Sequence, residues 1–147
     1  MVSLIRVEDL EFPKDYYYEP KHSWLRIEKD GSVTVGYDDF AQRAAGEIVF
    51  LDLPERGTKV EQFKAFAHVE SHKWVGEVIS PISGTVIETN EGLLENPRPI
   101  NDDPYGGGWM LKVEPEALQS ELKNLIHGDE DIRKWVRHDI KTVLRKE

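Results

Sequence analysis

Short runs of β-prone residues, separated by turn signals, fill most of the chain before Pro115. Two such runs flank Lys29-Asp30-Gly31, and an Asp-Gly pair between β-prone runs is typical of a hairpin turn. The other predicted strands are residues 47–53, 65–71, 74–79, 85–89 and 109–113. Many short strands with regular turns indicate a β-sandwich or barrel, so we expect a mainly β protein.

Helical patterns are few before Pro115 and dominate after it. Residues 38–46 predict a short helix, because an aspartate can cap its start and Gly46 can end it. Leucines and isoleucine at helical spacing predict a second helix over residues 118–126, which Gly128 ends. Asp129-Glu130-Asp131 then supplies the negative charge that favours a new helix start. The apolar stripe of this last helix consists of Ile132, Trp135, Val136, Ile140, Val143 and Leu144.

These patterns divide the chain into three regions. Residues 1–20 read as an N-terminal extended lead-in, residues 21–115 as the β domain, and residues 116–147 as a C-terminal helical extension. The amphipathic last helix either packs on the β domain or meets a partner or a second copy, and core packing is the favoured interpretation.

Charge and composition exclude several classes of function. The 147 residues, enough for one domain, include 28 acidic and 19 basic residues, giving a net charge of −9. Residues 31–115 alone contain 14 acidic and 7 basic residues, and such a surface repels nucleic acid. No apolar run approaches the roughly 20 residues that span a bilayer, and no secretory signal is recognised, so we expect a cytoplasmic protein that does not bind membranes. Without cysteine, the chain has no disulfide, thiolate metal site or cysteine nucleophile.

Candidate catalytic and metal sites are weak. Ser71 and His72 are adjacent in sequence, which is no evidence for the geometry of a catalytic triad. The five histidines lack any recognisable metal spacing. The Gly106–Gly108 triplet is not followed by the Gly-Lys-Ser/Thr of a phosphate-binding loop and predicts an ordinary loop instead. We therefore expect no catalytic residue and no metal site.

Lys73 is different because it lies between two predicted strands, at or near the tip of a hairpin that projects it into solvent. A lone turn lysine is usually just solvated. With the segment that follows, residues 76–86, the pattern reads as a hairpin, a crossing and a second hairpin, in which Gly84 allows a turn that residues with a β-carbon resist.

Several motifs, in order along the chain, resemble the H protein family of the glycine cleavage system, whose members are lipoyl carriers. The similarity runs from about His22 to Pro115. Its motifs are Gly36-Tyr37-Asp38-Asp39-Phe40-Ala41-Gln42, Gly46-Glu47-Ile48-Val49-Phe50-Leu51-Asp52-Leu53-Pro54, Val69-Glu70-Ser71-His72-Lys73, Ser80-Pro81-Ile82-Ser83-Gly84 and Asn101-Asp102-Asp103-Pro104-Tyr105, the last followed by Gly108-Trp109.

The resemblance implies a flattened β-barrel or sandwich hybrid of the lipoyl/biotinyl carrier type, with lipoate amide-linked to Lys73. It implies that Glu70 and Gly84 help the lipoate-attaching enzyme recognise its target, and that Glu77 keeps an acidic position that contacts the arm or its substrate. A biotin carrier would have methionines beside the lysine, where this chain has His72 and Trp74. The implied protein is a non-catalytic carrier that shuttles an aminomethyl group between glycine decarboxylase, aminomethyltransferase and dihydrolipoyl dehydrogenase.

Departures from the family keep two alternatives open. Ser23 stands where the family has a glutamate that is thought to hold the cationic methylamine on the loaded arm, and Trp74 adds bulk after the lysine. One alternative is an H-like lipoate-binding protein that carries sulfur for a heterodisulfide-reductase-like complex. The other is an unmodified scaffold or lipoyl-relay protein that only binds partners.

Overall fold

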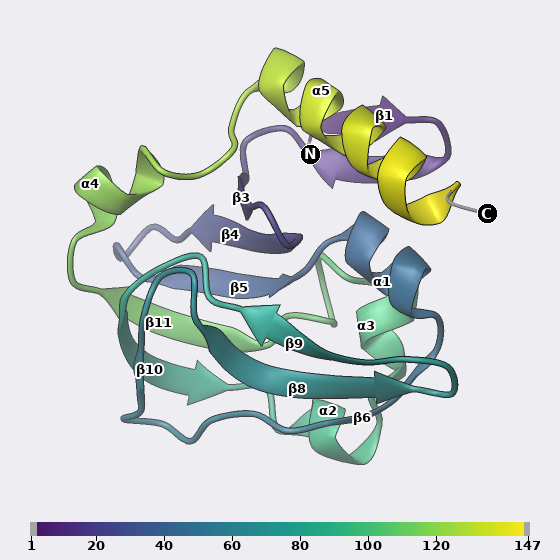
Figure 1. Ribbon diagram of the computed structural model, residues 1–147. Helices are drawn as coiled ribbons and strands as arrows, with labels where there is room; N and C mark the ends of the chain where they lie inside the picture. Colours follow the sequence, from purple (N-terminus) through teal and green to yellow (C-terminus); the bar gives the residue numbers. More distant parts are fainter. Residues whose placement is uncertain (1–2, 146–147) are drawn as a thin grey trace.

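The computed structural model describes residues 3–145 and consists of two packed β layers with helices at their edges (Figure 1). Neighbouring strands in both layers are antiparallel. The larger sheet has the order β3 (Tyr17–Glu19), β4 (Ser23–Ile27), β5 (Val33–Tyr37), β11 (Leu111–Pro115), β10 (Gly84–Thr89) and β7 (Lys59–Val60). The smaller sheet has the order β6 (Ile48–Leu51), β8 (Ala65–Ser71) and β9 (Val75–Ile79).

The main hydrophobic core lies between these sheets and follows from strand periodicity. In β8, Ala67 and Val69 are buried, whereas His68 and Glu70 are exposed. Successive side chains of a strand point to opposite faces, so this alternation places one face on the core and one in solvent. The predicted mainly β class, a flattened sandwich with C-terminal helices, is confirmed.

The short helix α1 (Asp39–Ala45) forms as its sequence predicts. The side chain of Asp38 accepts a hydrogen bond from the Ala41 N–H at 2.8 Å, and Gly46 ends the helix at φ 82°, where a glycine is favoured. Helices α2 (Gly92–Glu95) and α3 (Arg98–Asp102) follow β10, and α3 lies against α1 and β6.

Both ends of the chain add structure beside the β layers. Residues expected as an extended lead-in form a hairpin of β1 (Leu4–Val7) and β2 (Leu10–Pro13) before β3 joins the larger sheet. After β11 come α4 (Leu118–Leu122), α5 (Asp129–Asp139) and the π-helical turn η1 (Ile140–Leu144). Helix α4 is shorter than the predicted 118–126 because the backbone of Ile126 pairs with Tyr18. Two backbone hydrogen bonds of 2.8 and 2.9 Å to a strand replace the last helical turn.

Helix α5 packs its apolar stripe against the β1–β2 hairpin and forms a second hydrophobic cluster (Figure 1). Its members come from both ends of the chain, from strands β3 and β4 of the larger sheet and from α1. They include Ile5, Leu10, Phe12, Tyr18, Trp24, Phe40, Ile132, Val136 and Ile140.

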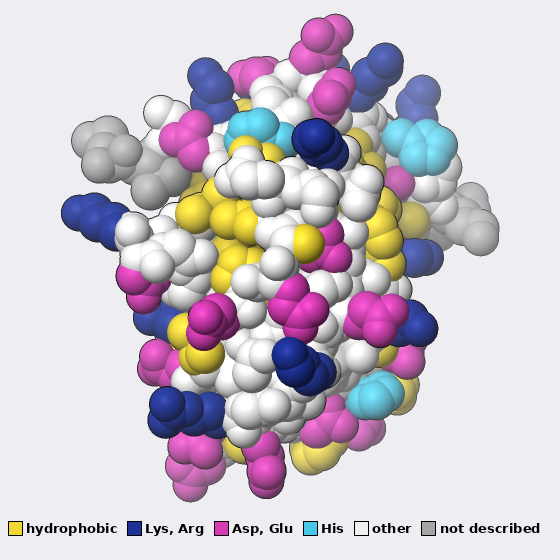
Figure 2. Space-filling view, turned by 90° about the vertical axis from the view of Figure 1, so that its left-hand side faces the viewer, with side chains coloured by type: hydrophobic (Ala, Val, Ile, Leu, Met, Phe, Trp, Pro, Cys, Tyr) yellow, Lys and Arg dark blue, Asp and Glu magenta, His cyan; other side chains and the backbone are white. Residues whose placement is uncertain are grey.

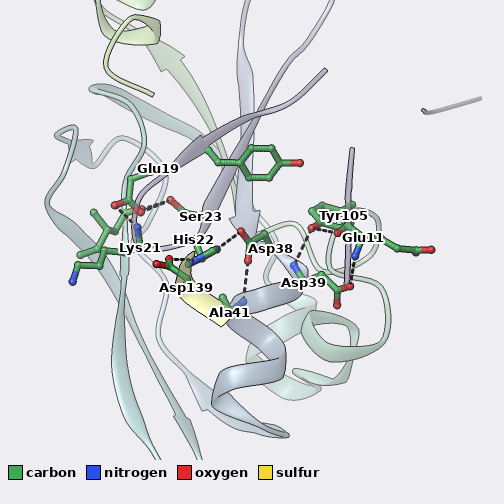
Figure 3. A network of polar contacts seen from close by, with 12 residues as sticks. Glu11, Glu19, Lys21, His22, Ser23, Asp38, Asp39, Ala41, Tyr105 and Asp139 are labelled. Atoms are coloured by element: carbon green, nitrogen blue, oxygen red, sulfur yellow. Dashed lines mark hydrogen bonds and ion pairs between the residues drawn. The ribbon is translucent and has the colours of Figure 1, made fainter. Parts of the chain in front are cut away.

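A buried polar network also joins α5 to the β domain (Figure 3). The imidazole of His22 lies between two carboxylates, with Nδ1 2.7 Å from Asp38 and Nε2 2.7 Å from Asp139 of α5. The rings of Phe40 and Trp135 stack on its two faces at 4.0 and 4.1 Å. Burial alone would lower the pKa of His22, but Asp38 and Asp139 outweigh it and raise this pKa to about 9. The imidazolium therefore clamps the C-terminal helix to the core at neutral pH.

The side of the molecule that carries α4 has acidic side chains over its whole height and a band of apolar side chains across its upper half (Figure 2). Among residues 3–145, no helix combines the length and the hydrophobicity required to cross a bilayer.

Candidate functional site

The β8–β9 hairpin presents Lys73 at its tip, as the sequence predicted. Glu70 pairs with Val75, and the Ser71 N–H donates a 2.8 Å hydrogen bond to the carbonyl of Trp74, which leaves His72 and Lys73 as the loop. Lys73 is exposed. Within residues 3–145 its ammonium has no ion-pair partner within 4.0 Å. The amine therefore lies at a defined point of a hydrogen-bonded hairpin and is open to reaction.

The stem of Lys73 lies over Gly46, the residue that ends α1. A β-carbon on Gly46 would stand 3.1 Å from Cε and 3.7 Å from Nζ of Lys73, so the absent side chain makes room for the lysine. Asn101 of α3 fixes this platform, because its Nδ2 donates to the Gly46 carbonyl at 2.9 Å and its Oδ1 accepts from the Ile48 N–H at 2.9 Å. The sequence indicates Asn101 only as part of a motif, because its positioning role depends on contacts far apart in sequence.

Glu70 lies on the outward face of the smaller sheet, next to the tip. Phe50, Glu70 and Val75 are cross-strand partners, and side chains opposite one another share a face. All three are exposed, as is Trp74, so the carboxylate of Glu70 has apolar neighbours. This surface, which we call the tip face, is what an enzyme that modifies Lys73 would meet.

Glu77 lies further from the tip on the same face. Its carboxylate is 3.7 Å from Nε2 of His68, whose Nδ1 is 3.2 Å from Asp52. These three side chains are exposed and form a polar row beyond the tip face. A contact between Glu77 and a modified Lys73 stays a prediction.

Gly84 is not brought to the tip, and the reason for a glycine there differs from the expected one. It begins β10 in the larger sheet, paired with Pro115 and Val60, at the opposite end of β9 from Lys73. Its φ is not positive, so the prediction that Gly84 allows a turn that other residues resist is wrong. A β-carbon on Gly84 would instead lie 2.2 Å from the backbone oxygen of Glu114, closer than atoms approach. Its role in recognition by the attaching enzyme stays a prediction.

A buried carboxylate that the sequence did not single out stands beside Ser23. Glu19 pairs with Ser23 across the β3–β4 ladder, and its carboxylate accepts from the Lys21 N–H at 2.9 Å and the Ser23 hydroxyl at 3.1 Å (Figure 3). The same hydroxyl lies 2.6 Å from the Ile79 carbonyl, at the end of β9. Burial raises the pKa of Glu19. A buried carboxyl group from the neighbouring strand therefore lies beside Ser23.

The alternative sites remain ordinary structure. No group of three or more metal-binding side chains within residues 3–145 is arranged to hold an ion. In the glycine triplet, the Gly107 N–H donates to the side chain of Asp103 at 2.8 Å, so the loop binds its own carboxylate.

Comparisons with known proteins find relatives over most of this chain. Residues 16–139 match the family model described as glycine cleavage H-protein. This chain belongs to the glycine cleavage H-protein family. The glycine cleavage system H protein of Halorhodospira halophila is 46% identical over 79% of this chain and 88% of its own length. That of Geobacillus thermodenitrificans is 45% identical over 80% of this chain and 91% of its own length.

A solved structure shares the fold. The crystal structure of a glycine cleavage system H protein from Mycobacterium marinum superposes with a TM-score of 0.67 at 38% identity, covering 71% of this chain and 86% of that one. Members of the H-protein family are lipoyl carriers and serve as the carrier component of the glycine cleavage system. The family match ends before η1 and begins after β2, so the β1–β2 hairpin and the end of the C-terminal helix lie outside it.

Proposed function

We propose that this chain is a lipoylated carrier of the glycine cleavage system, with lipoate joined through an amide to Nζ of Lys73. The observation that carries the proposal is the exposed amine of Lys73 at a two-residue hairpin tip, together with the family match. The primary amine of a lysine, on its flexible stem, can be acylated, whereas most exposed side chains of other residue types cannot. Lipoate would supply a dithiolane at the end of a long tether.

The residues around Lys73 support one geometry for attachment. The hairpin holds the amine at a fixed place, Gly46 leaves space for its stem, and Asn101 holds Gly46. Glu70 on the tip face gives the attaching enzyme a carboxylate three residues before the lysine. The ammonium first gives up one proton to become the nucleophilic amine. Acylation then forms the Nζ–carbonyl bond, expels the activating group of the lipoyl donor and releases a second proton from Nζ, so the cation becomes a neutral amide.

We further propose that the arm serves glycine decarboxylase, aminomethyltransferase and dihydrolipoyl dehydrogenase in turn. A tethered group has a high effective concentration near each docked partner, which suits a carrier that visits several active sites. Glu19 is the observation that favours the glycine version over the sulfur version, because it is a buried carboxyl group hydrogen-bonded to Ser23, beside the position where the family has its glutamate. Ser23 itself, uncharged and fully buried, is the observation that favours the sulfur version.

Intact mass tests the attachment. Coexpressed with a lipoate ligase and lipoate, the chain should gain the mass of one lipoyl group, and peptide mapping should place it on Lys73. Lys73→Arg should gain nothing, because a guanidinium is not the amine that is acylated. Lys64→Arg, at another exposed lysine, is the matched control and should be modified normally. A bare wild-type mass would favour the scaffold or relay alternative.

Loading tests the pathway. The lipoylated chain, mixed with glycine and the decarboxylating partner, should gain the mass of one aminomethyl group. A lipoylated chain that takes up no aminomethyl group but retains sulfane sulfur from thiosulfate would instead support the sulfur carrier.

A further inference from the structure

A basic groove lies between the β1–β2 hairpin and the C-terminal helix, away from the two main sheets. It encloses about 570 Å³, a volume typical of ligand sites. Six of its lining side chains are basic: Arg6, Lys134, Arg137, His138, Lys141 and Arg145. Such a concentration of positive charge is unexpected in a chain whose net charge is −9.

The charges lie along one face of α5 and η1. Lys134, Arg137 and Lys141 recur at helical spacing on the exposed side, opposite the buried stripe that includes Ile132 and Val136. Like charges three and four positions apart destabilise a helix. The stability of the helix therefore does not account for the row of Lys134, Arg137 and Lys141. The helix dipole favours cations in the last turn, but it does not explain Lys134 or the contribution of the hairpin.

Two arginines of the groove, Arg6 and Arg145, already hold carboxylates. Nη2 of Arg145 lies 2.6 Å from both carboxylate oxygens of Glu8, and Arg6 pairs with Glu11. In contrast, Lys134, Arg137 and Lys141 have no ion-pair partner within residues 3–145. Within residues 3–145, the groove thus pairs with carboxylates through Arg6 and Arg145 and has unpaired positive charge along its length.

The acidic surface around the groove limits the ligand to a short anionic segment. Residues 132–145 contain five Lys and Arg, and their one acidic residue, Asp139, is directed inward to His22. The rest of the chain is strongly acidic, and a nucleic acid or an anionic bilayer would extend over it and be repelled. A short acidic segment of a protein can contact the groove alone.

We propose that this groove docks an acidic segment of a partner protein. Helix α1 links the hairpin that lines the groove to the lysine arm. Arg43 of α1 pairs with Asp9 in the hairpin turn at 2.9 Å, and Gly46 at the end of α1 lies under Lys73. Helix α1 has seven residues, about 10 Å at the usual rise, so a partner held by the groove has Lys73 within easy reach.

Charge reversal tests the groove. Fluorescence anisotropy with a short fluorescein-labelled Glu/Asp-rich peptide, at low ionic strength, measures Kd for the full chain. Lys134→Glu, Arg137→Glu and Lys141→Glu combined should raise Kd about tenfold or more. The matched control combines Lys29→Glu, Arg56→Glu and Lys123→Glu, which are exposed elsewhere and change the net charge equally. It should change Kd less than about threefold.

Two single variants sharpen the test and do not depend on the folding of the triple variant. Arg137→Gln should weaken binding about threefold. Glu8→Gln should strengthen it about threefold, because it releases Arg145 from its internal carboxylate.

Four outcomes would overturn the proposal: equal weakening in both triple variants, no gain from Glu8→Gln, binding of inorganic pyrophosphate but not of the peptide, and binding to phosphatidylserine vesicles but not to the peptide. Because the assay requires no lipoate, it succeeds or fails independently of the modification of Lys73.

Discussion

The stability of this protein should fall steeply at mildly alkaline pH because of one buried histidine. His22 has a pKa of about 9 in the folded chain, against about 6.5 when unfolded. A raised pKa stabilises the fold fully below the unfolded value, and this contribution is lost as the pH rises through the folded value. The window of loss therefore lies between about pH 6.5 and about pH 9.5.

The size of the effect follows from the same shift. A difference of about 2.5 pKa units corresponds to about 3 kcal/mol of unfolding free energy, at about 1.4 kcal/mol per unit. Asp38 and Asp139 both contribute through 2.7 Å contacts. Asp139→Asn removes one of the two charges, so its loss of stability over the window should be markedly smaller, and its stability at pH 6.5 should already be lower.

Urea unfolding at a series of pH values measures this directly, and an NMR titration gives the pKa of His22 itself. Asp129→Asn is the matched control, since it removes a carboxylate from the exposed start of the same helix. Its pH dependence should equal that of the wild type. A wild-type unfolding free energy that stays flat from pH 6.5 to about pH 9.5 would refute the clamp, as would an Asp139→Asn variant with an unchanged slope.

Three further predictions concern the carrier domain. Gly84→Ala should lower the unfolding free energy by about 2 kcal/mol or more, because its β-carbon meets the backbone oxygen of Glu114, and an unchanged urea midpoint would contradict this. Glu19→Gln should leave the unfolding free energy at pH 7 equal or higher, because it removes a buried charge. The same variant should lower aminomethyl loading without lowering lipoylation, and normal loading would exclude Glu19 from the site. Asn101→Ala should cost about 2 kcal/mol and increase hydrogen exchange around Gly46, and unchanged exchange would show that the platform is held otherwise.

Much of the carrier domain could be predicted from sequence because its signals are local. Asp-Gly between β-prone runs predicted the β4–β5 hairpin, and Asp38 with Gly46 predicted both ends of α1. The exposed tip of the β8–β9 hairpin was predicted for the same reason, since alternation and turn residues act over a few positions.

The features that could not be predicted depend on strand register and on contacts across the chain. Nothing local to Gly84 reveals that Glu114 passes within 2.2 Å of its missing β-carbon. The approach of Glu19 to Ser23 follows from the pairing of β3 with β4, although they are only four residues apart. The early end of α4 reflects competition from Tyr18, a strand residue more than a hundred positions away.

The second hydrophobic cluster has a consequence for any shortened form of this protein. Ile5 and Phe12 near one terminus share it with Ile132 and Val136 near the other. Deleting either segment alone would expose the apolar side chains of the other segment to solvent and favour aggregation. A minimal carrier should therefore be designed by trimming the two ends together, with polar replacements at Trp24 of β4 or Phe40 of α1, which would newly meet water.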